Sequence, residues 1–292
     1  MEIVTIPCLR DNFAYLLICP KTGDPAVVDP SESEPVRKEI NHRNVKLKAI
    51  LNTHHHWDHV GGNKELNANC PDLKIYGHAS DRGRIPEQTE FLEDGDQVQF
   101  GAQLGSFLHN PGDTSGAIIY LFGETAFRGD TLFAAGCGKI FEGTPEQMHD
   151  SLNNRIGKLT DRTELYFGHE YTENNLRFAL SVEVGNTEIN KKLADVKVLR
   201  SSGKFSTPTT IAEEKKTNPF LRCTSAEIKR RGSLSLVLQF NSNSVNALAK
   251  ELLQRKEGVV ELETVSLRRS DTAEPVAVSL RVREKIIDKP SE

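Results

Sequence analysis

Residues 51–63, which read LNTHHHWDHVGGN, concentrate groups that bind metal ions. Four histidines and one aspartate fall within positions 54–59, in a chain that has nine histidines in all. Packed imidazoles would repel one another when protonated and would waste burial when neutral, unless a cation collects them. Imidazole and carboxylate together form the ligand set of zinc, iron and manganese. The cluster therefore predicts a metal site.

The spacing inside the cluster favours two ions. In an extended loop His54 and His56 point to the same side while His55 points elsewhere. Asp58 and His59, one turn later, can face a second ion. Two neighbouring ions need a bridging carboxylate and ligands from distant segments. The candidates follow later strand-like segments: Asp130 in FRGDTLF, His169 in YFGHEYT, and His109 or Asp113 in HNPGDTSG.

Composition narrows the class of protein. The chain has 292 residues, which suits one large domain or one domain with an appendage, and its net charge of −4 does not favour a nucleic-acid partner. The longest apolar run, AYLLIC, is too short to cross a bilayer, and the first residues do not resemble a signal peptide. The five cysteines are odd in number and form no CxxC pair, which indicates a reducing compartment. We expect a cytoplasmic protein that does not bind membranes and is a monomer.

The elements that must position the cluster alternate between strands and helices. Short β-branched segments open the chain, a helix is expected over 34–43, and the buried-type strand LKAILN ends where the cluster begins. A further helix is expected near 63–69, followed by five more strand-like segments. The segment from 144 to 159 is the clearest helix, with Thr144 and Gln147 placed for a capping box. This order predicts a layered α/β body.

The last part of the chain has a different pattern. After the segment ELYFGHEYT the pattern is mainly helical, from about 173 to 216. Residues 233–240 then alternate as a strand, a helix is expected near 244–256, and strand-like runs end in VAVSLRVREK. We expect domains at 1–172 and 173–292, with an atypical α/β tail from about 223.

Several motifs in order resemble the metallo-β-lactamase superfamily, and within it the glyoxalase II (hydroxyacylglutathione hydrolase) family. They are DNFAYL, AVVDP, THHHWDH, GDTLFAAGCGKIFEG, GHEYTENNLRFA and AEEKKTNPFLR, and they extend from about residue 3 to residue 222. The resemblance implies an αββα sandwich followed by a mainly helical domain. It also implies hydrolysis of the thioester S-D-lactoylglutathione to D-lactate and glutathione by a metal-bound hydroxide.

The same resemblance assigns the metal ligands. His54 and His56 would bind the first of two divalent ions, which would be zinc, iron or manganese. Asp58, His59 and His169 would bind the second ion, and Asp130 would bridge the two. Asp58 and Asp130 are thereby the expected catalytic carboxylates.

The chain departs from the family pattern at Asp113. The family segment reads Pro-x-His-Thr, and its histidine is the third ligand of the first ion, but this chain reads PGDTSG. Three alternatives follow. Asp113 ligates the ion itself, because carboxylates bind zinc at about 2.0–2.2 Å; the first site is mostly empty and activity is low; or His109 substitutes. We favour a binuclear site with a weakened first half.

The resemblance also predicts contacts to glutathione. Lys139, in GCGKIFEG, would meet the glycyl carboxylate, and Tyr171 would contact the substrate backbone. Phe141 stands where family members often have tyrosine. In the tail Arg281, Arg283 and Lys285 look similar to basic residues of the family, although a solvated basic face explains them equally well.

Three other functions compete with the thioester hydrolase. Relatives with this fold use one iron ion to oxidise glutathione persulfide, but the complete second set of ligands argues against that activity. A weakly active or non-catalytic glutathione-binding relative is supported by Asp113 alone. A β-lactamase is less favoured still, because the loop with Lys139 implies a glutathionyl substrate.

Overall fold

The computed structural model describes residues 1–70, 72–232, 236–238, 260–264 and 278–284, with side chains described as far as Lys229. The chain divides into two compact units, Met1–Arg222 and Cys223–Glu292. No helix in the described ranges is both long enough and apolar enough to cross a membrane.

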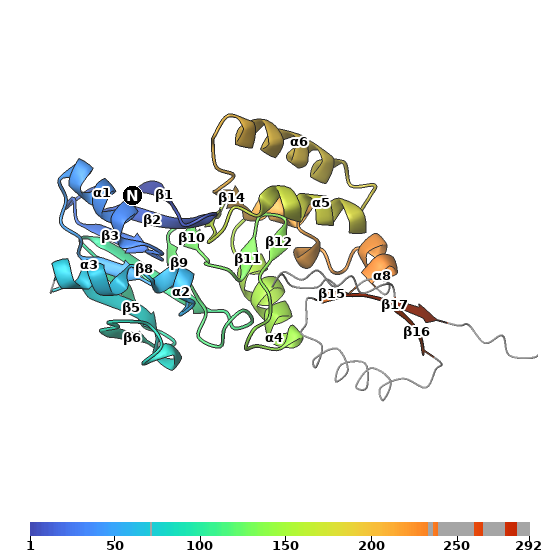
Figure 1. Cartoon of the computed structure of the whole chain (residues 1–292), viewed down its shortest axis with the longest axis horizontal. Helices are drawn as coiled ribbons and strands as arrows, with labels where there is room; N and C mark the ends of the chain where they lie inside the picture. Colours follow the sequence, from blue (N-terminus) through green and yellow to red (C-terminus); the bar gives the residue numbers. More distant parts are fainter. Residues whose placement is uncertain (71, 233–235, 239–259, 265–277, 285–292) are drawn as a thin grey trace, which may run out of the picture. The chain divides into compact units, whose positions relative to one another are not determined.

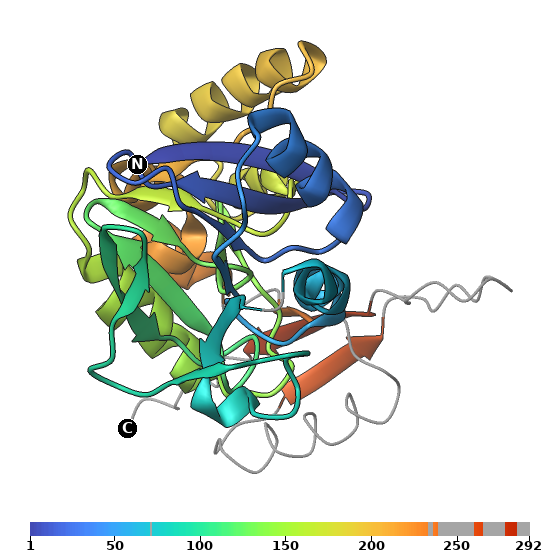
Figure 2. The ribbon, with the colours of Figure 1, turned by 90° about the vertical axis from the view of Figure 1, so that its left-hand side faces the viewer.

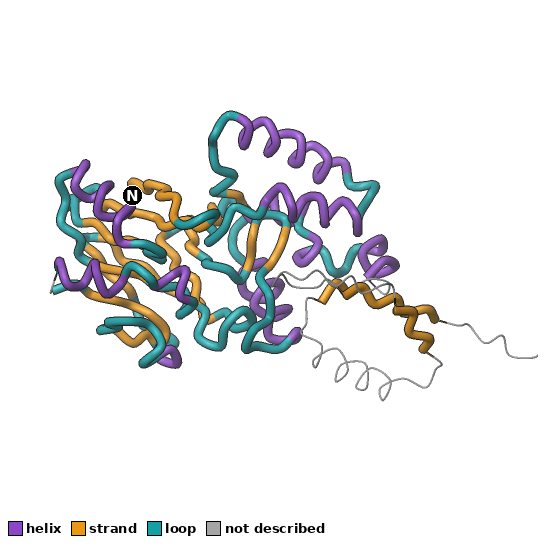
Figure 3. Tube along the Cα trace, in the orientation of Figure 1, coloured by secondary structure: helices purple, strands orange, loops and turns teal. Residues whose placement is uncertain are grey.

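The first unit contains two six-stranded sheets (Figures 1 and 3). In the first sheet the strand order follows the chain, with antiparallel pairing from β1 to β3 and parallel pairing from β3 to β6. The strands are β1 (Glu2–Cys8), β2 (Asn12–Ile18), β3 (Pro25–Val28), β4 (Ala49–Leu51), β5 (Lys74–His78) and β6 (Glu90–Leu92). Every residue of β3 and β4 is buried, as expected for strands covered on both faces.

The second sheet has the order β14-β13-β10-β9-β8-β7, in which only β10 and β13 are parallel. Its strands are β7 (Val98–Phe100), β8 (Gln103–His109), β9 (Ile118–Phe122), β10 (Thr125–Phe127), β13 (Glu164–Tyr166) and β14 (Thr209–Thr210). A short ribbon, β11 (Leu132–Phe133) and β12 (Gly136–Cys137), follows β10. All the strand segments expected from the sequence of this unit are present.

The apolar side chains divide the first unit into layers. Leu17, Val28 and Leu51 of the first sheet share one buried cluster with Tyr120 and Phe127 of the second. A separate cluster joins the first sheet to α1 (Ser33–Arg43), α2 (Trp57–Val60) and α3 (Asn63–Asn69), and Figures 1 and 2 show α1 beside those strands. A third cluster joins the second sheet to α4 (Pro145–Asp150) and α7 (Ile211–Thr217). This is the predicted αββα sandwich.

The remaining helices follow the predicted pattern with one difference. Thr144 and Gln147 form the expected capping box of α4, but regular α-helix stops at Asp150, and a π turn (Ser151–Arg155) and a 3-10 turn (Ile156–Lys158) continue it. Helices α5 (Thr172–Val182) and α6 (Thr187–Ser201) lie side by side, and further 3-10 turns cover Ala79–Asp81 and Pro219–Leu221.

The second unit contains α8 (Ala226–Gly232) and an antiparallel sheet in the order β15-β17-β16. Its strands are β15 (Leu236–Leu238), β16 (Val260–Thr264) and β17 (Val278–Glu284). The helix expected near 244–256 lies outside the described residues, as does Lys285. Arg281 and Arg283 belong to β17, where they pair in register with Glu263 and Glu261.

Candidate metal centre

The histidine cluster follows the central strand of the first sheet. Strand β4 ends at Leu51, and the chain then runs through Thr53 to His56 before the single turn of α2 begins. The backbone N–H of His59 donates to the carbonyl of His56 at 2.9 Å. A buried apolar strand therefore anchors the loop, and one helical turn adds Asp58 and His59, whose ring centroid lies 4.2 Å from that of His54.

His54, His56 and Asp113 bring three ligand atoms together, and we call them the first half of the site. His54 Nε2 lies 3.0 Å from His56 Nδ1 and 3.5 Å from Asp113 Oδ2, which is 3.4 Å from His56 Nδ1. Metal bonds of about 2.0–2.1 Å in a tetrahedral site would separate neighbouring donors by about 3.3 Å. Asp113 therefore reaches the place that a third ligand requires, despite its short side chain.

Asp58, His59 and His169 form the second half of the site. Asp58 Oδ2 lies 3.4 Å from His169 Nε2 and 4.0 Å from His59 Nε2. The side chains of His59 and His169 are almost fully buried, at 1% and 5% exposed. His169 comes from the segment after β13, so the fold brings it to a cluster more than a hundred residues earlier.

Asp130 lies between the two imidazoles of the second half. Its Oδ1 is 3.3 Å from His59 Nε2 and its Oδ2 is 3.1 Å from His169 Nε2. This approach requires a glycine at position 168, because a Cβ there would lie 2.2 Å from Asp130 Oδ1 and 2.7 Å from the His59 ring.

Three atoms of the site are buried and lack a hydrogen bond: His59 Nε2, Asp113 Oδ2 and Asp130 Oδ1. A buried polar atom left without a partner costs free energy, so such groups need an explanation. All three belong to the donor sets just described. The nitrogen and oxygen donors present therefore fit divalent metal ions.

Two further carboxylates, not singled out from the sequence, hold the histidines of the second half. Asp29 Oδ2 lies 3.1 Å from His59 Nδ1 and accepts from the Thr53 hydroxyl at 2.6 Å, while Asp29 Oδ1 accepts from the Thr53 N–H at 2.8 Å. Asp11 Oδ1 lies 2.8 Å from His169 Nδ1. Such partners fix which ring nitrogen is free to bind a metal.

The position of Asp29 could have been inferred from the sequence. It follows β3, which pairs in parallel with β4, so its carboxylate emerges at the same sheet edge as the cluster. Asp11 has no such signal. It lies in the turn between β1 and β2 and reaches His169 through an isolated bridge between Asn12 and His169.

In the metal-free protein, burial and neighbouring charges shift the pKa values of the donors in opposite directions. Burial raises the pKa of Asp113 to about 8, and the negative charge of Asp130 adds to the effect. Burial acts against a charged His59, but Asp130 and Asp29 together hold the His59 pKa well above its ordinary value. Burial lowers the pKa of His54 well below its ordinary value. Asp113 and His54 of the first half are therefore expected to be mostly uncharged in the metal-free protein at neutral pH.

His55 and His109 lie outside both halves. His55 Nδ1 is 2.9 Å from Asp81 Oδ1, in agreement with the expectation that it points away from its neighbours. His109 stacks on His78 with ring centroids 4.2 Å apart, and its Nε2 is 2.8 Å from the carbonyl oxygen of Ser115. These contacts favour Asp113 over His109 as the third donor of the first half.

Two aromatic side chains from predicted substrate positions flank the donors. The Phe141 ring is 5.0 Å from the His56 ring and is 63% exposed. The Tyr171 ring stacks on His169 at 4.8 Å. Lys139 is exposed on the loop between β12 and α4, two residues before Phe141. One exposed ring therefore lies beside each half of the site.

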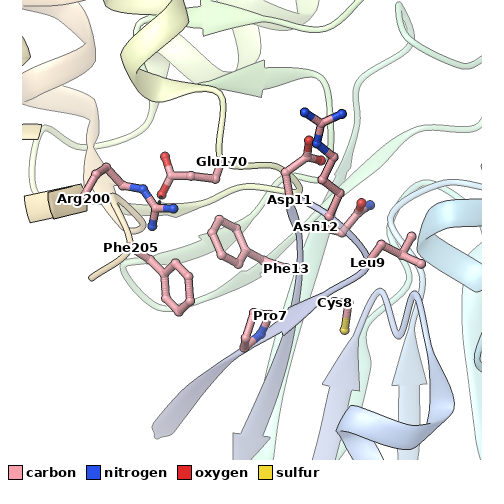
Figure 4. Close-up of a pocket in the computed structure, with 10 residues that line it drawn as sticks. Pro7, Cys8, Leu9, Asp11, Asn12, Phe13, Glu170, Arg200 and Phe205 are labelled. Atoms are coloured by element: carbon pink, nitrogen blue, oxygen red, sulfur yellow. Dashed lines mark ion pairs between the residues drawn. The ribbon is translucent and has the colours of Figure 1, made fainter. Parts of the chain in front are cut away.

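Asp11 and Asn12 also line a cavity of about 170 Å³ (Figure 4). Phe13, Phe205 and the ion pair between Arg200 and Glu170 also line it. The Asp11 side chain is accordingly 33% exposed, whereas that of Asp29 is 3% exposed. The two carboxylates that hold the second half therefore differ in their access to water.

The sequence is similar to two known protein families and to named members of one of them. Residues 10–169 match the model of the metallo-beta-lactamase superfamily, and residues 170–256 match that of the hydroxyacylglutathione hydrolase C-terminus. Hydroxyacylglutathione hydrolases from Thermosynechococcus vestitus and Trichodesmium erythraeum are 49% and 48% identical to this chain. In both comparisons 76% of this chain and 89% of the relative are covered.

Solved structures support the same fold. The B3 metallo-beta-lactamase BLEG-1 has a TM-score of 0.58 at 22% identity, over 75% of this chain and 99% of its own. The di-iron-bound form of TTHA1623 has a TM-score of 0.53 at 26% identity, over 76% of this chain and all of its own. The predicted fold and family are thus confirmed. This chain belongs to the hydroxyacylglutathione hydrolase family of the metallo-β-lactamase superfamily.

Proposed function

We propose that this protein hydrolyses S-(2-hydroxyacyl)glutathione thioesters, with S-D-lactoylglutathione as the substrate and D-lactate and glutathione as the products. The observation that carries the proposal is the pair of three-donor groups, each with ligand atoms within 4.8 Å of one another, in a member of this family. The alternative of a mononuclear iron persulfide dioxygenase needs only one such group.

We infer that seven side chains would hold two divalent ions. His54, His56 and Asp113 would hold one ion, Asp58, His59 and His169 would hold the other, and Asp130 would bridge them. Bound there, the ions would lower the pKa of a water molecule to near neutrality and polarise the thioester carbonyl. Zinc, iron and manganese all accept these donors, and the three carboxylates favour the harder ions, iron and manganese.

The chain's own residues bind and orient the reactants. Asp29 and Asp11 accept from the outer nitrogens of His59 and His169, which leaves both Nε2 atoms available at the site. Phe141 and Tyr171 border the site from either side. Lys139 would pair with the glycyl carboxylate of glutathione.

The proposed reaction uses water, and not a protein side chain, as the nucleophile. Water adds to the acyl carbon, the C–S bond breaks, and glutathione leaves as a thiolate. A thiol with a pKa near 8.5 is a good leaving group, so a general acid is not required. The cysteines have no role in this scheme, and no disulfide joins them within the described residues. We also propose a cytoplasmic location and a monomeric state.

The test is hydrolysis of S-D-lactoylglutathione by the protein as purified and after loading with zinc, iron or manganese. Turnover that rises with one of these ions is the expected result. Absence of turnover with every ion, while a non-hydrolysable S-alkylglutathione still binds, would identify a binding protein instead. Oxygen consumption with glutathione persulfide would identify the dioxygenase.

A further inference from the structure

A polar network lies beside the first half of the metal site. It consists of His55, Asp81, Arg84, Ser115 and Glu142, and we call it the Arg84 junction. His55 stands between two predicted ligands in the sequence, but its Nδ1 faces Asp81 at 2.9 Å and its Nε2 contacts Arg84. The Asp81 carboxylate is fully buried. The junction is thus attached to the histidine loop through His55, whose ring nitrogens both face residues other than the metal donors.

Glu142 connects the junction to the predicted substrate loop, residues 138–143. Both terminal nitrogens of Arg84 donate to its carboxylate, one of them to Oε2 at 3.1 Å. Oε2 also accepts from the Ser115 N–H and hydroxyl, each at 2.9 Å. The hydrogen bond from Arg84 is the main reason that the pKa of Glu142 falls to about 2. At neutral pH the loop therefore carries a charged anchor with partners on two other segments.

The backbone of the same loop runs along the segment that contains Asp113. The N–H groups of Phe141 and Glu142 both donate to the Asp113 carbonyl, at 3.1 and 3.2 Å, and Gly143 donates to Gly112 at 3.2 Å. The three side chains that precede Glu142 in this loop are largely exposed to solvent. Lys139 is exposed, Ile140 is 43% exposed and Phe141 is 63% exposed.

We propose that Arg84 and Glu142 are positioning residues that set the affinity for the glutathione part of the substrate. They hold loop 138–143, and with it Lys139 and Phe141, in a fixed place beside the first half of the site. This inference rests on the proposed thioester hydrolysis. Without the ion pair between Arg84 and Glu142, the substrate would have to order the loop when it binds. The entropic cost of that ordering would weaken binding and would leave the rate of the chemical step unchanged.

An exposed ion pair with no consequence for binding is the competing explanation, because most such pairs contribute little to stability. Two features argue against it. The pair is bidentate and its side chains are only 38% and 29% exposed. In addition, Glu142 has further donors from Ser115, which lies two residues after Asp113.

The test uses Glu142→Gln in the full-length, metal-loaded protein, with Glu142→Asp as the conservative variant. The matched control is Glu124→Gln, which removes the partner of Arg162 in a surface pair at 2.7 Å. Kinetics are measured with S-D-lactoylglutathione and with S-lactoyl-N-acetylcysteamine, a thioester that has no glutathione carboxylates. Calorimetry measures the binding of S-methylglutathione, and metal content is determined for every variant.

The expected result is a rise of about tenfold in KM for the glutathione thioester, with kcat within about twofold of wild type. S-Methylglutathione should bind about tenfold more weakly, while the small thioester, metal content and the control stay unchanged. Glu142→Asp should recover part of the affinity. Equal losses on both thioesters, loss of metal, or unchanged affinity would each overturn the proposal. If the wild-type protein fails to hydrolyse the thioester, the proposed function fails, and the calorimetry still decides the role of the junction.

Discussion

Asp29→Asn is the variant from which the structure predicts most about the second half of the metal site. Asp29 Oδ2 faces two donors, the Thr53 hydroxyl at 2.6 Å and His59 Nδ1 at 3.1 Å, while Oδ1 accepts from the Thr53 N–H. The asparagine oxygen can keep the bond to the Thr53 N–H, which places the amide NH₂ against the other two groups. The hydroxyl can rotate and accept, but an imidazole N–H cannot.

In its neutral form, which is the form that binds a metal, His59 must then carry its proton on Nε2 and not on Nδ1. That proton would point at Asp130 Oδ1, 3.3 Å away, where a metal ligand needs a lone pair. The loss of a hydrogen bond to a charged, buried group costs about 1.5–3 kcal/mol. This energy corresponds to a loss of about 10–100-fold in metal affinity. For a unit of this size a loss of about 2 kcal/mol lowers the melting temperature by about 4–8 °C.

The assay is calorimetric titration of the metal-free protein with zinc, together with thermal denaturation. Asp161→Asn, in an exposed pair with Lys215, is the matched control. Asp11→Asn should lose only a few-fold in affinity, because water reaches Asp11 and can replace the lost acceptor. Wild-type metal affinity in Asp29→Asn would refute the tautomer argument. So would a larger loss in Asp11→Asn than in Asp29→Asn.

Three further predictions follow from buried groups, and a fourth concerns the metal itself. Asp113→His should increase the zinc retained after dialysis against a chelator, because imidazole suits zinc better than a carboxylate does; an unchanged zinc-to-protein ratio would contradict this. Arg128→Leu should leave the melting temperature unchanged or raise it, because the guanidinium of Arg128 is buried without a hydrogen bond. A fall above about 5 °C would show that its charge is needed. Gly116→Ala should destabilise the protein by about 1–3 kcal/mol in denaturant titrations, because the new Cβ would meet the buried Asp81 carboxylate at 2.5 Å; wild-type stability would mean that Asp81 can move. Metal at about 100 times its Kd should add about 2.7 kcal/mol of stability, and a melting temperature that chelator leaves unchanged would argue against a resident ion.

The sequence predicted those parts of the site that depend on local spacing. His54, His56, Asp58 and His59 lie in one loop and one turn, and alternation and helical spacing predict that they divide into two groups of donors. The sheet strands were also predictable from local sequence. Short apolar runs such as PAVV and AIL are typical of strands buried on both faces, and both runs are fully buried. These features need no knowledge of which segments meet.

The rest of the site depends on contacts between distant segments. Asp11 and His169 are 158 positions apart, and Glu142 and Arg84 are 58 apart. No periodicity in the sequence reveals such a pair, because Asp11, Arg84 and Glu142, each taken alone, resemble surface charges in turns. The early end of α4 was equally hidden, because the capping box of Thr144 and Gln147 marks only the start of the helix and does not indicate the π turn at Ser151–Arg155.

Asp113 changes the charge of the site more than its shape. Its carboxylate reaches the two histidines of the first half at 3.4–3.5 Å, so the donor set is geometrically complete. The site then holds three carboxylates, Asp58, Asp113 and Asp130, where the family pattern has two. In the metal-free protein burial and the neighbouring Asp130 oppose this third charge and raise the pKa of Asp113 to about 8. An ion entering the first half at neutral pH must therefore displace a proton from Asp113, whereas a neutral histidine would offer its lone pair directly. We therefore expect the proton on Asp113, and not the length of its side chain, to limit the affinity of the first half for a metal ion.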